Sequence, residues 1–277
     1  MANQSYNIKD VYSVFNKIDG EFGVMNNGSE FANQLIKKYC PKRRANFNGL
    51  GTCYDYHEMA TSGVINLVEM LKDKFDSKYD KLAEYAILFL SYKLNQHSEH
   101  KYKSPNLNDF YTNHIGKNTF YDKKIKDNGP TYKEIIDKKK DLMNINIKEI
   151  SKFNTLFNIL FVLYNGIKNN KVDCTKYPSY PGNFANKFEE LNNDSNINGN
   201  SSYSKLLSTL SDDYNNLKNI YDSNHSCNFP PLPKVKTPPS KLIPVLSTFS
   251  VIPLFFGIAY KTIYKKKIKK SKEEIET

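Results

Sequence analysis

The chain has 277 residues and a formal net charge of +11, so it is long enough to bury a core and basic enough to suggest nucleic-acid binding. The charge is unevenly spread, however: residues 241–277 hold eight Lys and three Glu, and elsewhere lysines are interspersed with acidic residues. This pattern lacks the continuous basic surface that nucleic acids require, and we expect no nucleic-acid partner.

The N-terminal part of the chain predicts three helices. Apolar residues recur every three or four positions in the segments 9–18, 30–39 and 53–75, which is typical of amphipathic helices. The first twenty residues contain no apolar run resembling a signal peptide. We therefore expect either that a later segment is the sorting signal or that the N-terminal part stays cytosolic in a tail-anchored arrangement.

The segment 84–94 is the most apolar stretch of the first 240 residues. Its uncharged part is too short to cross a bilayer, so we expect a core helix that is surrounded by other helices. A further short helix is predicted at 106–115.

The next two helices are predicted from a cap and from periodicity. Thr131 and Glu134 have the spacing of a capping box, in which each side chain bonds the other residue's backbone amide, and this predicts a helix over 131–143. Apolar residues at steps of three and four predict the longest soluble helix at 147–167, with Phe157 at the centre of the core.

The C-terminal third of the soluble part predicts helices at 184–191 and 203–221, separated by a polar loop at 192–202. Residues 223–240 then contain five prolines. Proline-rich chain extends at roughly 3.1 Å per residue, so we expect residues 229–240 to form a spacer about 35 Å long.

The segment 242–260 contains no charged residue and predicts a transmembrane helix. At a rise of 1.5 Å per residue it covers roughly 28 Å, close to the roughly 30 Å hydrocarbon core of a bilayer. The alternative is a buried core helix, but such helices are usually shorter and apolar on one side. The lysines after the span place the tail in the cytosol and the N-terminal part outside.

Two sets of residues carry this prediction. The membrane anchor comprises Leu242, Ile243, Val251, Leu254, Phe255, Phe256 and Ile258, and the basic tail comprises Lys265, Lys266, Lys267, Lys269 and Lys270.

The chain has four cysteines, all on the side predicted to lie outside. Four cysteines allow three pairings, of which Cys40 with Cys53 and Cys174 with Cys227 is the least entangled. Unpaired buried thiols are the alternative. No pair has the C-x-x-C spacing of a zinc or redox site.

No catalytic or cofactor motif is recognisable. His57-Glu58 opens like a zinc-protease motif, but Thr61 stands where the second histidine belongs. His97, His100 and His114 are possible metal ligands, with solvated histidines in a polar loop as the plainer interpretation. We therefore expect no enzyme activity, no metal, no cofactor and no small-molecule substrate.

Several stretches together resemble the Plasmodium interspersed repeat (PIR) family, the variant multigene family of malaria parasites. The resemblance covers most of the chain from about residue 40 to residue 261. The segments that carry it are YAILFLSYKLNQ (85–96), NLNDFYTNHI (106–115), YKEIIDKKKDLMNINIKEISKF (132–153), DCTKY (173–177), FEELNNDSNINGNSSYSKLLSTLSDDYNNLKN (188–219) and SKLIPVLSTF (240–249).

The resemblance implies an exported, single-span protein with a helical N-terminal domain, at the infected red cell surface or in the parasitophorous vacuole. Family members are thought to act in antigenic variation, adhesion or immune evasion without catalysis, and they commonly lack a signal peptide. This chain departs from the family pattern in lacking a cysteine before residue 20 and in having a short proline linker in place of a Ser/Thr-rich region.

The predicted organisation is an all-α, multi-helix soluble ectodomain (1–222), a proline-rich linker (223–240), a transmembrane segment (241–264) and a lysine-rich cytosolic tail (265–277). The predicted function is surface display for contact with a host protein or receptor or for immune evasion. The alternative is a structural or trafficking membrane protein without direct receptor binding. The lipid bilayer is the one partner that the sequence itself indicates.

Replacing Phe255 and Phe256 by Arg should prevent insertion and delivery, because each charge at the centre of a span costs about 2.5 to 3.5 kcal/mol. Carbonate extraction and microscopy of the tagged variant measure this. Normal delivery of the double variant would show that the sorting signal lies elsewhere.

Overall fold

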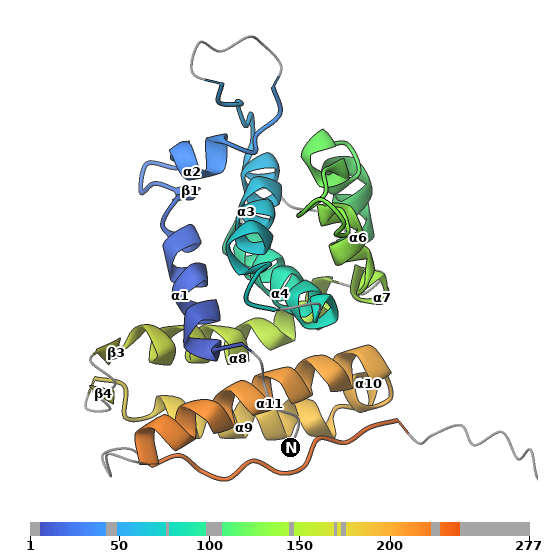
Figure 1. Ribbon diagram of the computed structural model, residues 1–277. Helices are drawn as coiled ribbons and strands as arrows, with labels where there is room; N and C mark the ends of the chain where they lie inside the picture. Colours follow the sequence, from blue (N-terminus) through green and yellow to red (C-terminus); the bar gives the residue numbers. More distant parts are fainter. Residues whose placement is uncertain are drawn as a thin grey trace, which may run out of the picture. The chain divides into compact units, whose positions relative to one another are not determined.

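The computed structural model describes residues 6–42, 49–75, 78–97, 107–143, 147–168, 171–172, 176–222 and 228–238 (Figure 1). All of these belong to one unit of the chain, residues 1–238. The predicted membrane anchor and basic tail, and Cys174 and Cys227, lie outside the described residues. Among the helices that are described, none is long and apolar enough to cross a membrane.

The described chain is mostly helical, as predicted, with two short antiparallel strand pairs, β1 with β2 and β3 with β4. The N-terminal elements are α1 (Ile8–Asp19), β1 (Phe22–Val24), β2 (Glu30–Ala32), α2 (Gln34–Lys37), α3 (Tyr56–Leu71) and α4 (Tyr79–His97). The central elements are α5 (Leu107–Phe110), the π-helical turn η1 (Tyr111–Ile115), the 3₁₀ turn η2 (Thr119–Asp122), α6 (Tyr132–Asp137) and α7 (Lys140–Met143). The C-terminal elements are α8 (Ile147–Asn165), β3 (Ile167–Lys168), β4 (Lys171–Val172), α9 (Tyr180–Asn193), α10 (Ser195–Asn198) and α11 (Ser201–Asp222).

Helix α8 lies between two groups of helices. It packs against α1 and α4 on one side and against α9 and α11 on the other (Figure 1). Helix α3 packs against α4 and α1 and completes the first group. This arrangement explains why α4 and α8 are apolar around most of their circumference, since each has neighbours on several sides.

The centre of the core is built from aromatic rings, and Phe157 of α8 is fully buried among them, as the sequence predicted. Phe15 of α1 lies 5.1 Å from the Phe157 ring, edge to face, and stacks on Phe89 of α4 at 5.6 Å. Such aromatic pairs add about 0.5 to 1.5 kcal/mol each beyond the burial of their area.

A buried acidic residue, Asp213 of α11, accepts hydrogen bonds from three tyrosines of three other helices. Tyr85 of α4 and Tyr12 of α1 donate hydrogen bonds to its carboxylate at 2.7 and 3.0 Å. Tyr164 of α8 donates to its backbone carbonyl at 2.7 Å. Burial raises the pKa of Asp213 to about 7, and the two tyrosine hydrogen bonds oppose this rise.

The helix predicted over 30–39 is wrong in its first half. Residues Glu30–Ala32 form β2, which pairs with Phe22–Val24 in a hairpin. Gly28 adopts a positive φ of 81° at the turn, and the Met25 amide bonds the Ser29 carbonyl at 2.8 Å. The Asn-Gly pair at residues 27–28 is a known hairpin signal that the helical periodicity obscured.

Other details also differ from the prediction, and the polar loop predicted at 192–202 contains the short helix α10. The capping box of Thr131 and Glu134 is present, but α6 ends at Asp137 and a separate helix, α7, follows, where one helix to residue 143 was predicted. Between them, Lys139 forms an ion pair of 2.7 Å with Glu84 of α4. Helix α11, with 22 residues, is longer than α8, with 19, which was predicted to be the longest.

The proline-rich segment is not a free spacer where the structure describes it. Phe229 is 4% exposed and packs on the rings of Tyr214 and Tyr221. Asn192 of α9 donates to the Lys234 carbonyl at 3.0 Å and accepts from the Lys236 amide at 2.8 Å. We call residues 228–238 the C-terminal strap, because they bind the helical domain instead of extending away from it.

Replacing Phe157 by Asp should abolish cooperative unfolding, because it removes a core ring and buries an unpaired charge, at a cost above about 4 kcal/mol. Thermal unfolding followed by circular dichroism measures this. The matched control is Asn158→Asp, an exposed position on the same helix, which should unfold within about 0.5 kcal/mol of the parent chain. A native-like melt for Phe157→Asp would contradict the placement of α8.

The raised pKa of Asp213 predicts a pH dependence. Because the folded chain holds this proton up to about pH 7 and the unfolded chain releases it near 3.8, the free energy of unfolding should fall as pH rises between these values. The loss from this group is about 4 kcal/mol at most.

Urea unfolding from pH 4 to pH 8 compares the parent chain with Asp213→Asn, whose neutral amide can still bond the tyrosines. The difference between the two stability curves isolates Asp213, since all other groups are shared. Parallel curves would show that the carboxyl does not titrate in this range.

Candidate functional site

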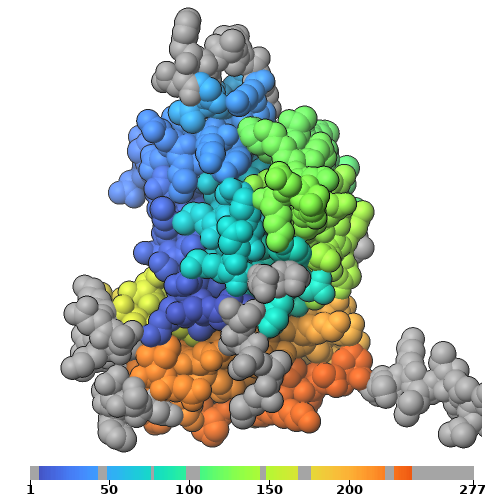
Figure 2. Space-filling view, in the orientation of Figure 1, coloured from blue at the N-terminus to red at the C-terminus, as the bar shows by residue number. Residues whose placement is uncertain are grey.

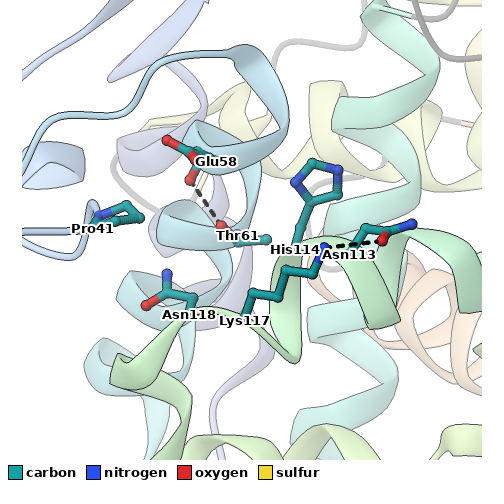
Figure 3. A pocket seen from close by; sticks show the side chains of 7 residues that line it. All are labelled: Pro41, Glu58, Thr61, Asn113, His114, Lys117 and Asn118. Carbon is teal, nitrogen blue, oxygen red and sulfur yellow. Dashed lines mark hydrogen bonds between the residues drawn. The ribbon is translucent and has the colours of Figure 1, made fainter. Parts of the chain in front are cut away.

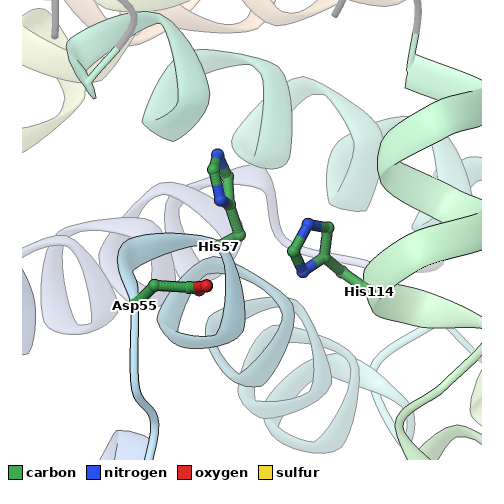
Figure 4. Close-up of side chains that lie close together, drawn as sticks. All are labelled: Asp55, His57 and His114. Atoms are coloured by element: carbon green, nitrogen blue, oxygen red, sulfur yellow. The ribbon is translucent and has the colours of Figure 1, made fainter. Parts of the chain in front are cut away.

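Asp55, His57 and His114 lie together at the N-terminal end of α3. One ligand atom from each side chain can be chosen so that all three lie within 4.8 Å of one another. Asp55 and His57 project from the start of α3, and His114 reaches towards them from η1 (Figure 4). All three side chains are half-buried. We call this set the histidine cluster.

The start of α3 holds two of these residues by helix capping. Asp55 is the N-cap, in extended backbone conformation, and its Oδ1 accepts from the Glu58 amide at 2.9 Å. Glu58 reaches back to accept from the Tyr54 amide at 2.8 Å. Such caps satisfy backbone amides that the helix leaves unpaired, and they fix the Asp55 side chain in place.

Aromatic rings surround the two histidines. The His57 and His114 ring centroids are 4.8 Å apart, and Phe110 lies 4.9 Å from His114 and 5.9 Å from His57. His97 lies further off, 6.4 Å from His57, where it stacks on Tyr56 and its Nε2 contacts a carboxylate oxygen of Glu30 at 3.2 Å.

Both imidazoles of the cluster have pKa values below the usual 6.5. Burial is the main cause for each. His114 lowers the pKa of His57 further, whereas Asp55 raises the pKa of both and so limits the shift. Both side chains are therefore mainly neutral at pH 7.

A small polar pocket adjoins the cluster and shares His114 with it (Figure 3). Its volume is about 280 Å³, just below the usual range for drug-sized ligands, and apolar side chains do not dominate its lining. The lining residues are Pro41, Glu58, Thr61, Asn113, His114, Lys117 and Asn118. The pocket suits water or a small polar molecule better than an apolar ligand.

Of the three histidines considered together from the sequence, His97, His100 and His114, the cluster contains His114. His100 lies outside the described residues, and His97 is not part of the three-residue set. His57 was discarded because Thr61 occupies the position of a second ligand, and Thr61 instead donates to the Glu58 carbonyl at 2.9 Å. The partner of His57 comes from 57 residues further along the chain, which no local motif could indicate.

The first cysteine pair forms a disulfide in the structure. Cys40 and Cys53 are bonded, with a Cα–Cα distance of 5.0 Å, and Ser62 of α3 contacts the Sγ of Cys53 at 3.5 Å. This bond ties the end of α2 to the segment that leads into α3.

The fold is that of a PIR ectodomain. The chain matches a solved structure described as a Plasmodium PIR protein ectodomain with a TM-score of 0.60 and 33% sequence identity, over 82% of this chain and 100% of that chain. Residues 9–261 match the family described as Plasmodium variant antigen protein Cir/Yir/Bir, and the chain belongs to this family. Comparison with curated proteins finds no match.

The geometry of the cluster predicts coupled histidine titrations. Replacing His114 by Gln should raise the pKa of His57 towards 6.5, because a neighbouring ring that becomes positively charged is removed. Imidazole proton resonances followed by NMR against pH measure the shift. Thr112→Ala, at an exposed position on the same turn, is the control, and an unchanged His57 titration in His114→Gln would contradict the arrangement.

Proposed function

We propose that this protein is an exported variant surface antigen of a malaria parasite that displays its helical domain for contact with host molecules or for immune evasion. The observation that carries the proposal is the family match, which runs from residue 9 in α1 to residue 261, just past the predicted span. The match to a PIR ectodomain supports the same assignment for the helical unit.

The Cys40–Cys53 disulfide supports a location of this domain outside a reducing cytosol. Disulfides persist in oxidising compartments and are rare where thiols are kept reduced. The charge asymmetry of residues 241–277 favours the same topology, with lysines after the apolar segment on the cytosolic side.

The division between core and surface suits a variable antigen. The aromatic centre around Phe157 and the Asp213 hydrogen bonds tolerate little change, since volume and polarity are both constrained there. Segments from α1 through α11 reach the molecular surface in Figure 2, and substitutions at exposed positions usually change stability by less than about 0.5 kcal/mol. The surface can therefore vary while the fold persists.

The β1–β2 hairpin offers apolar side chains for contact with a host molecule. Val24 is 38% exposed and Met25 49% exposed, both at or beside the hairpin turn. Flexible, exposed methionine side chains adapt to different partners. We propose that the host contact is a protein.

Protease added to intact infected cells should remove the helical domain and leave a short membrane-protected fragment. An antibody against residues 265–277 detects that fragment, and a soluble vacuolar protein that stays intact is the control for membrane integrity. Full protection of the helical domain, with digestion only after permeabilisation, would refute surface display and favour a structural or trafficking role inside the vacuole.

A further inference from the structure

We propose that the histidine cluster, Asp55, His57 and His114, binds one Zn²⁺ ion. The ion would be held by two imidazole nitrogens and one carboxylate oxygen, with a water molecule at the fourth position. This goes beyond the proposed display function, and neither depends on the other.

The distances allow such a site with small side-chain movements. Zinc in a tetrahedral site lies about 2.0 to 2.2 Å from nitrogen and oxygen ligands, which puts the ligand atoms about 3.4 Å apart. The ligand atoms here lie within 4.8 Å of one another, so the widest gap closes by about 1.4 Å. All three side chains are half-buried.

The donor set selects the class of metal. Imidazole nitrogens suit zinc and its transition-metal neighbours, whereas calcium and magnesium prefer oxygen ligands throughout. Zinc sites with three protein ligands carry water as the fourth. The polar pocket beside His114 provides the space from which that water can enter (Figure 3).

The surrounding charge also fits a cation. The Asp55 carboxylate offsets one charge of the ion. The Glu58 carboxylate lines the same pocket as His114 and would attract a cation, whereas the Lys117 ammonium on that pocket opposes this attraction.

The backbone around the cluster is built to hold the ligands. Asp55 is fixed by its cap bond to the Glu58 amide, and a carboxylate can accept that bond and still offer its other oxygen. His114 sits on a π-helical turn, which closes with a bond of 2.7 Å from the Gly116 amide to the Tyr111 carbonyl. π-Helical turns are rare in proteins, and those that occur lie frequently at functional sites.

A bound ion would cross-link α3 to the segment 107–115, which are distant in sequence. It would act as a structural staple at the end of α3 that the Cys40–Cys53 disulfide already restrains. Because the ion binds the folded chain, zinc should raise the melting temperature.

Isothermal titration of the purified full chain with zinc chloride tests the proposal, in mild detergent, without an affinity tag and with any free thiols alkylated. We expect one zinc ion per chain and a rise in melting temperature that a chelator reverses. Cobalt(II) chloride should give the intense visible absorption of tetrahedral nitrogen and oxygen coordination.

Three variants remove one ligand each: Asp55→Asn, His57→Gln and His114→Gln. Asn is as good an N-cap as Asp, so Asp55→Asn keeps α3 capped and removes only the charge. Each variant should weaken zinc binding at least about tenfold, since even outer-shell changes typically cost that much. Thr112→Ala should bind zinc like the parent chain.

The proposal fails if the parent chain binds no zinc, or if all three variants bind it as tightly as the parent does. Should the variants fail to fold, as judged by circular dichroism, NMR of the parent chain decides. Zinc must then shift the imidazole resonances of two of the five histidines in the chain. A shift of none of them would also refute the site.

Discussion

The rest of this fold depends on the buried carboxylate of Asp213. Its two oxygens and its backbone carbonyl accept hydrogen bonds from Tyr85, Tyr12 and Tyr164, so α11 is tied to α4, α1 and α8 in one network. A polar group at this depth is costly unless it is bonded, and removing any one tyrosine hydroxyl would leave it partly unsatisfied. The four helices are therefore held in a single arrangement, although hydrophobic contact alone would allow them to slide.

Two further features, the histidine cluster and the C-terminal strap, lie outside this central network. At one end of α3, the disulfide, the Asp55 cap and the π-helical turn converge on the histidine cluster. On the C-terminal side, Asn192 and Tyr214 bind the strap over residues 228–238. The strap was predicted as a free spacer, whereas the cluster lies on segments that were predicted as helices. The strap stays hydrogen-bonded to the helical domain as far as Lys236.

In a variant antigen, it matters which residues hold the fold and which can change. The residues that hold the fold are internal aromatic rings, a buried acid and backbone caps, while exposed positions such as Met25 and Asn158 lie outside this core. Members of a family can therefore differ at the surface positions and keep the internal residues. The proposed zinc site would add one more internal restraint at a place where two distant segments meet, and it would leave the outer surface unchanged.

The sequence by itself determined the helical class, the positions of α1, α3, α4, α8, α9 and α11, the burial of Phe157 and the capping box of α6, because each depends on periodicity or spacing within a few helical turns. The family segments, read in order, also identified the family. The tertiary structure decided the β1–β2 hairpin, the break before α7, the packing of the strap and the meeting of His57 with His114. The break before α7, the packing of the strap and the meeting of the two histidines each involve contacts between residues far apart in the chain. Neither local propensity nor a short motif contains that information.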